Sequence, residues 1–116
     1  MTVTLIVVAA LLGVAAAGSA IQKLRRDTTV VASMHAVGVT DRQIPLLAIL
    51  ELLGALGLLI GIWWPPVGIA AAVGLTAYFL GAVLAHIRSR SGVGHALPAM
   101  IILILAIATT ILEVSR

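Results

Sequence analysis

The chain has 116 residues, of which 62% are hydrophobic and only 9% are charged, and its mean hydropathy is +1.25. Soluble domains are closer to half apolar and a quarter charged, and a core this small cannot hide so much apolar surface. The composition therefore excludes a soluble protein and indicates an integral membrane protein with one domain, residues 1–116. The lack of cysteine excludes disulfides, thiolate metal sites and dithiol redox chemistry within the chain. The net charge of +3, without a basic patch interleaved with aromatic residues, gives no indication of a nucleic-acid partner.

Four apolar runs each approach the roughly 20 residues that an α-helix needs to cross a bilayer. Because backbone groups in lipid must be satisfied within the segment, runs this continuous predict helices and an all-α fold. The first run contains small residues, as a signal peptide does, but its positive charges follow the run, so we expect an uncleaved helix. The expected spans cover residues 2–22, 44–63, 67–86 and 97–113.

The long connection between the first two spans, residues 23–43, carries a helical pattern of its own. Asp27 is a plausible N-cap of this helix and Gly38 a plausible C-terminal stop. We expect a short amphipathic helix at the membrane interface, and two interpretations are open: a lid over a cavity, or a linker that merely buries its apolar face. The apolar residues with helical period are Val30, Val31, Met34 and Val37.

The later spans are joined by short links, which demand antiparallel neighbours. Trp63-Trp64 is expected to anchor one interface and Pro65-Pro66 to form a tight turn, while Glu113 is expected at the interface beyond the fourth span. These features predict a polytopic membrane protein built as an antiparallel four-transmembrane-helix bundle. Small residues at helical spacing predict close helix packing on three spans: Gly13 and Ala17, then Gly54, Gly57 and Gly61, then Gly74, Gly81 and Ala85.

Positive residues are distributed unequally between the two ends of the expected bundle. By the positive-inside rule, the two basic connections face the cytoplasm and both termini lie outside. Six positive residues fall on the expected cytoplasmic side and one on the other: Lys23, Arg25, Arg26, Arg42, Arg88 and Arg90, against Arg116.

Glu51 lies inside an apolar run that is otherwise free of charge. A carboxylate in hydrocarbon costs several kcal/mol unless it is paired, protonated or hydrated. The helical rise places it in the cytoplasmic half of the membrane, near the level of Lys23 and His86. Tyr78 lies deeper on the same helix face as His86, and His35 on the interfacial helix is positioned to cover the opening.

Three uses of this cluster are open from the residues alone. Glu51 and His86 can act as catalytic acid and base and relay a proton. Lys23 or an arginine can pair with Glu51 and only tie helices together. Alternatively, Lys23, His35 and Tyr78 can bind a lipophilic ligand through its carbonyl or hydroxyl groups. No metal site is predicted, because no two histidines have ligand spacing on one helix.

The chain resembles the DoxX-like family of small four-helix membrane proteins over nearly its whole length. The glutamate-leucine-x-glycine core and the alanine-histidine-x-arginine ending of the third span are the most family-like pieces. The motifs that carry the resemblance are Gln22-Lys23-Leu24, Val37-Gly38-Val39, Leu50-Glu51-Leu52-Leu53-Gly54-Ala55-Leu56-Gly57-Leu58-Leu59, Gly81-Ala82-Val83-Leu84-Ala85-His86-Ile87-Arg88 and Pro98.

The resemblance implies a bacterial inner membrane protein related to subunits of thiosulfate:quinone oxidoreductase. A redox role would then need a bound quinone or a redox partner subunit. The leading hypothesis is a quinone- or lipophile-binding component of a membrane oxidoreductase. The second is a small intramembrane isomerase or hydrolase that uses Glu51 and His86 on a lipophilic substrate. The third is a non-catalytic scaffold, and the glycine stripes would permit a homodimer.

Overall fold

A computed structural model describes residues 2–26, 28–88 and 93–115, and these residues form helices joined by short links, without a strand. Three residues with expected roles lie outside the described residues. They are Asp27, the expected helix N-cap, and Arg90 and Arg116, whose charges bear on the membrane topology. The five helices are α1 (Thr2–Leu24), α2 (Thr28–Ala36), α3 (Gln43–Gly61), α4 (Pro65–Arg88) and α5 (Val93–Ser115).

Four of these helices are long and apolar enough to cross a membrane, which confirms the four-span prediction. The candidate spans are Val3–Leu24, Gln43–Gly61, Pro65–Arg88 and Leu97–Ser115.

The helix ends differ from the expectation at the link between the second and third spans. α3 stops at Gly61, before the tryptophans, and α4 starts at Pro65. The prediction that Pro65-Pro66 forms the turn is therefore wrong. Proline suits the first turn of a helix, because the N–H groups there have no intrahelical acceptor in any case. α5 likewise begins five residues before Pro98, which lies inside the helix.

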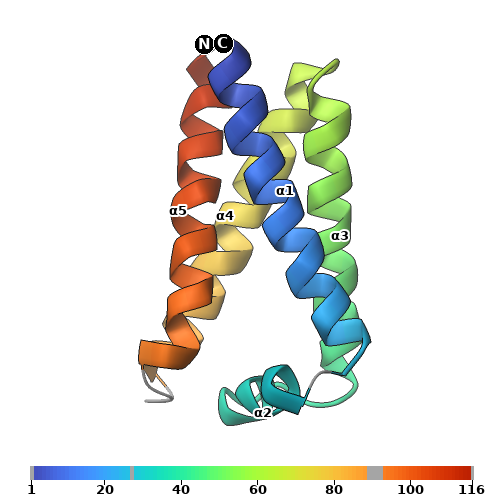
Figure 1. Ribbon diagram of the computed structural model, residues 1–116, viewed down its shortest axis with the longest axis vertical. Helices are drawn as coiled ribbons and strands as arrows, with labels where there is room; N and C mark the ends of the chain where they lie inside the picture. Colours follow the sequence, from blue (N-terminus) through green and yellow to red (C-terminus); the bar gives the residue numbers. More distant parts are fainter. Residues whose placement is uncertain (1, 27, 89–92, 116) are drawn as a thin grey trace.

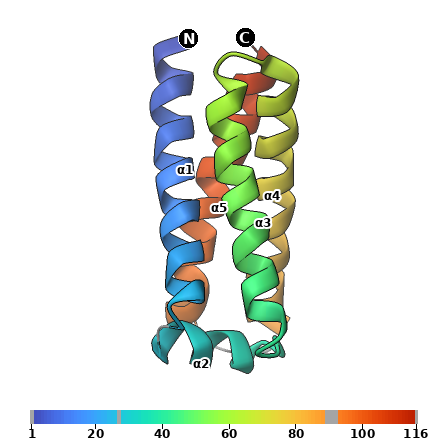
Figure 2. The same cartoon turned by 90° about the vertical axis from the view of Figure 1, so that its right-hand side faces the viewer.

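The four spanning helices run alternately up and down, with both chain termini at one end and α2 across the other (Figures 1 and 2). α1 and α4 each pack against both α3 and α5. In Figure 1, α1 runs diagonally from α5 toward α3, while α4 runs behind it from α3 toward α5. At the end near α2, the bundle is therefore divided into two pairs, α1 with α3 and α4 with α5.

Small residues allow close approach where the helices cross. The stripe Gly54, Gly57 and Gly61 packs against α4, as the sequence predicts: a Cβ added at Gly61 would meet the backbone of Gly68. Small-residue packing is the usual basis of helix association in lipid. The central cluster consists of Leu12, Ala16, Leu58, Ala72, Leu75, Phe79 and Ala106.

Three other glycines do not pack as expected. Gly13, Gly74 and Gly81 have open space where a side chain would be. The expectation that these glycines mediate close packing is wrong. The divergence of the two helix pairs explains the result at Gly81, which lies toward the α2 end and faces a cavity.

Candidate functional site

A cavity of about 520 Å³ lies at the α2 end of the bundle, between the two helix pairs. Its volume is within the range of small-molecule binding sites. All five helices contribute to its wall, and most of the wall is apolar. The lining residues are Ser19, Gln22, Lys23, Thr29, Val30, Met34, Val37, Val39, Leu47, Tyr78, Phe79, Gly81, Ala82, Ala85, His86, Pro98, Ala99 and Ile102.

A buried ion pair stands at the wall of this cavity. The Nζ atom of Lys23, in the last turn of α1, lies 2.5 Å from Oε1 of Glu51 on α3. Lys23 also donates a hydrogen bond to the hydroxyl of Ser19, one helical turn earlier, at 2.8 Å. The Tyr78 hydroxyl on α4 donates to the same Glu51 oxygen at 3.1 Å. One carboxylate thus joins α1, α3 and α4.

Burial makes this cluster energetically demanding. The Glu51 side chain is fully buried and that of Lys23 is 6% exposed. Removing two charges from water costs several kcal/mol each, which their attraction repays only with good geometry and further hydrogen bonds. Ser19 and Tyr78 supply such bonds, but Oε2 of Glu51 has no hydrogen-bond partner among the described residues. The pair is therefore a costly feature for a bundle that could have used leucine here.

The structure places some of the predicted site residues on the cavity wall and others behind it. Lys23 and Tyr78 line it directly, whereas Glu51 lies behind them and reaches the cavity only through these two side chains. His86, buried in the last turn of α4, also lines the cavity. These three titratable side chains, from α1 and α4, therefore face the same space.

Small residues on α4 keep this space open. Tyr78, Ala82 and His86 follow one another at intervals of four residues and all line the cavity, as their shared helix face predicts. Gly81 and Ala85 lie beside them on the wall. Larger side chains at these positions would occupy the volume that a ligand needs.

The apolar face of α2 closes one end of the cavity. Val30 and Met34, from the predicted stripe, line the cavity. The helix ends at Ala36, and Gly38 follows with a φ of 86°, which confirms it as the stop. The amide of Gly38 donates to the carbonyl of His35 at 3.1 Å. This placement favours the lid interpretation of α2 over that of a simple linker.

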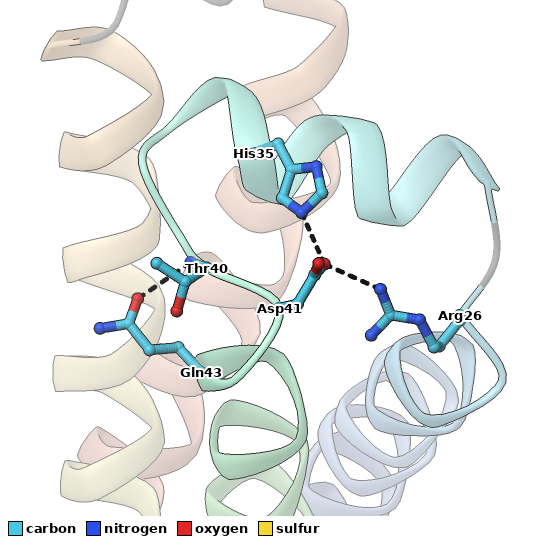
Figure 3. A network of polar contacts seen from close by, with 5 residues as sticks. All are labelled: Arg26, His35, Thr40, Asp41 and Gln43. Carbon is cyan, nitrogen blue, oxygen red and sulfur yellow. Dashed lines mark hydrogen bonds and ion pairs between the residues drawn. The ribbon is translucent and has the colours of Figure 1, made fainter.

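His35 does not reach the cavity. Its ring nitrogen Nε2 lies 2.8 Å from Oδ1 of Asp41, and Nη2 of Arg26 donates to the same oxygen at 2.8 Å (Figure 3). These three exposed side chains, which we call the Asp41 cluster, connect the end of α1, α2 and the segment that precedes α3. Arg26 has a left-handed φ of 55°, a conformation that costs a non-glycine residue about 1–2 kcal/mol.

The Asp41 cluster makes the closed position of α2 dependent on pH. The hydrogen bond from Arg26, and then that from His35, lower the pKa of Asp41 below its ordinary value. The carboxylate therefore stabilises the closed position above that ordinary value, about 3.9, and the contribution disappears as the pH falls through the lowered pKa. We expect hydrogen exchange of the α2 amides, corrected for its intrinsic pH dependence, to rise a few-fold below about pH 4.

The variant Asp41→Asn is the control for this prediction. It should show the faster exchange of α2 already at neutral pH and no further acceleration in acid. Equal exchange in the variant and the wild type at neutral pH would mean that the Asp41 cluster does not hold α2.

A second buried carboxylate lies at the opposite end of the bundle. Glu113 is 3% exposed, and its carboxylate is next to Gly68, so this side chain is buried between helices, while its place at the membrane interface stays a prediction. The sequence contained one signal for this burial: Thr109 lies one turn earlier on α5, and two polar residues at this interval share one helix face. The structure buries Thr109 as well. Within the described residues, no group of three or more histidine, aspartate or glutamate side chains could hold a metal ion.

Comparisons with known proteins agree with this architecture. A family model described as the DoxX-like family matches residues 7–109, which is most of the chain. Comparisons with curated proteins and with solved structures give no significant match to either. The matched range includes all of α2, α3 and α4 and every residue that lines the cavity. This chain of four membrane-spanning helices therefore belongs to the DoxX-like family.

Proposed function

We propose that this protein binds a quinone or a similar lipophile in the cavity, as a component of a membrane oxidoreductase. The observation that carries the proposal is the buried Lys23–Glu51–Tyr78 cluster at the wall of an otherwise apolar cavity. Sites for lipophilic ligands combine a mainly apolar wall with a few polar groups that orient the ligand. A scaffold would have no need of such a cluster, since leucine would pack at lower cost.

The hydrogen-bonding capacity of the cluster matches a carbonyl or hydroxyl head. Lys23 carries three N–H donors, of which Ser19 and Glu51 engage two, so the third can bond a ligand oxygen. Tyr78 donates to Glu51 and can therefore accept a bond from a ligand hydroxyl. His86 adds a ring that can exchange a proton with the same ligand. The electrons for a redox reaction would come from a partner subunit.

The charges favour one orientation of this site. Lys23, Arg25, Arg26, Arg42 and Arg88 all lie at the α2 end of the bundle. By the positive-inside rule, we propose that this end faces the cytoplasm of a bacterium and that both termini lie outside the inner membrane.

A second candidate function is acid–base catalysis on a lipophilic substrate. The hydrogen bond from the Tyr78 hydroxyl to the Glu51 carboxylate favours it, because the hydroxyl oxygen can accept a proton from a substrate while its own proton passes to the carboxylate, which can return it in the reverse direction. This alternative predicts turnover by the isolated chain, whereas the oxidoreductase proposal predicts bound ligand and no turnover without a partner.

Filling the cavity should remove the ligand. We expect gently purified Ala85→Leu protein to carry at least tenfold less quinone or other lipophile than the wild type, because the added carbons occupy the cavity. The measurement is mass spectrometry of organic extracts. The matched control is Ala77→Leu, an exposed position on the same helix that does not line the cavity, and it should retain wild-type amounts. Ordinary phospholipid alone in all three samples would refute the proposed function.

A further inference from the structure

We infer that the ligand is an amphiphile with one polar head and one hydrocarbon tail, and that the tail leaves the cavity sideways, between α1 and α5, into the bilayer. This inference rests on the proposed function and adds the class of ligand and its route. Three observations support it: the distribution of polar groups in the cavity, the contacts that bridge three of its four sides, and the position of α2.

The titratable side chains that line the cavity, Lys23, Tyr78 and His86, lie on α1 and α4, and Thr29 adds a hydroxyl from α2. Lys23 and Tyr78 share the carboxylate of Glu51, and His86 lies two turns beyond Tyr78 on the same helix face. The walls that α2 and α5 contribute are mainly apolar, for example Met34 and Ile102. A molecule that is polar throughout, or apolar throughout, would leave one of these surfaces unsatisfied. An amphiphile satisfies both.

Contacts close three of the four sides of the cavity. Between α1 and α3, the ion pair of Lys23 with Glu51 fills the space. Between α3 and α4, the hydrogen bond from Tyr78 to Glu51 does so. α4 and α5 form one of the two close pairs of the bundle. α3 and α4 also diverge toward α2 (Figure 1), but a tail that left between them would have to pass the buried bond from Tyr78 to Glu51, and the other two sides are held by an ion pair and by a packed helix pair.

The remaining side lies between α1 and α5. The two helices diverge toward α2 (Figure 1), and both contribute residues to the cavity wall: Gln22 from α1, and Pro98 and Ala99 from α5. All three residues fall within the candidate membrane spans, close to their ends, so we expect this side to border the hydrocarbon layer. A hydrocarbon tail that passes here stays in an apolar environment.

The α2 end is an unfavourable route for the same tail. The Asp41 cluster holds α2 in place there (Figure 3), and it forms a charged layer together with Arg25 and Arg42. Moving a hydrocarbon tail through this layer would expose it to water and displace charged groups. α2 therefore closes this end of the cavity and is not the entrance of the ligand.

Reversible cross-links distinguish the two routes, because the chain has no cysteine of its own. Gln22→Cys with Ala99→Cys closes the α1–α5 side, and His35→Cys with Asp41→Cys fixes α2 to the segment before α3. Each pair is joined with bifunctional methanethiosulfonate reagents and released with a reductant. The probe is a radiolabelled benzoquinone with an alkyl tail, and the measurement is its rate of exchange from protein in lipid nanodiscs.

We expect the α1–α5 link to slow exchange at least tenfold, with full recovery on reduction, and the α2 link to change it less than twofold. A benzoquinone with a diazirine at the end of its tail should label α1 and α5 residues and not α2. Slower exchange only with the α2 link, or unchanged exchange with both links, would overturn this inference and leave the proposed function intact. Failure of the unlinked protein to bind the probe would refute both.

Discussion

Replacing Glu51 with glutamine is expected to lower the free energy of unfolding by about 3–5 kcal/mol, because it leaves the charge of Lys23 buried without its counterion. Lys23 and Glu51 approach to 2.5 Å with almost no exposure, so the lysine charge would lose its counterion in a mainly apolar surrounding. Lys23→Met should cost a similar amount, since the carboxylate then remains alone in an apolar surrounding. Unfolding in mixed micelles with a rising fraction of sodium dodecyl sulfate measures both effects.

The double variant Lys23→Met/Glu51→Leu separates stability from function. Removing both charges should recover most of the stability that either single change removes, because a well-packed apolar pair often equals or exceeds a buried ion pair. Ligand in organic extracts should nevertheless be lost in all three variants. As a control, Arg26→Gln breaks an exposed pair with Asp41 and should alter global unfolding far less. Full retention of ligand by the double variant would make the pair a structural tie only.

The meeting of Lys23, Glu51 and Tyr78 could be predicted in part from the sequence. A charge within an apolar run must find a partner, and the helical rise places Glu51 at the level of Lys23 and His86. The sequence leaves open whether Glu51 meets Lys23 or His86, because that depends on how each helix is rotated about its axis. The structure brings Glu51 to Lys23 and Tyr78, and it places His86 on the wall of the same cavity.

The cavity itself and the position of His35 could not be predicted from the sequence. The cavity exists because α1 and α4 cross, which divides the bundle into two pairs near α2 (Figure 1). Crossing angles depend on how side-chain ridges fit together, and composition does not report this. His35 follows Met34 directly, and neighbouring helix positions face different directions, so Met34 lines the cavity while His35 bonds Asp41.

The crossing of α3 and α4 near the chain termini should tolerate no added side chain. Gly61→Ala is expected to lower the free energy of unfolding by about 1–3 kcal/mol or more, the usual cost of overpacking. The new Cβ would lie 2.6 Å from the backbone nitrogen of Gly68, and neither backbone can move without separating the helices. Gly68→Ala should cost less than Gly61→Ala, because its Cβ would meet the carboxylate end of the Glu113 side chain, at 2.6 Å, and not a backbone atom. Unfolding in mixed micelles is again the measurement.

Other glycines of α3 and α4 supply matched controls for this prediction. Gly74→Ala adds a Cβ in open space and should be neutral or stabilise by up to about 1 kcal/mol, since alanine is the better helix former. Gly54→Ala should fall between these extremes, because its Cβ would meet the side chain of Leu75 and no backbone atom. A loss of stability at Gly74 as large as that at Gly61 would show that the cost comes from glycine replacement in general. The graded order Gly61, Gly54, Gly74 would instead locate the close approach of α3 and α4 at the end of the bundle opposite the cavity.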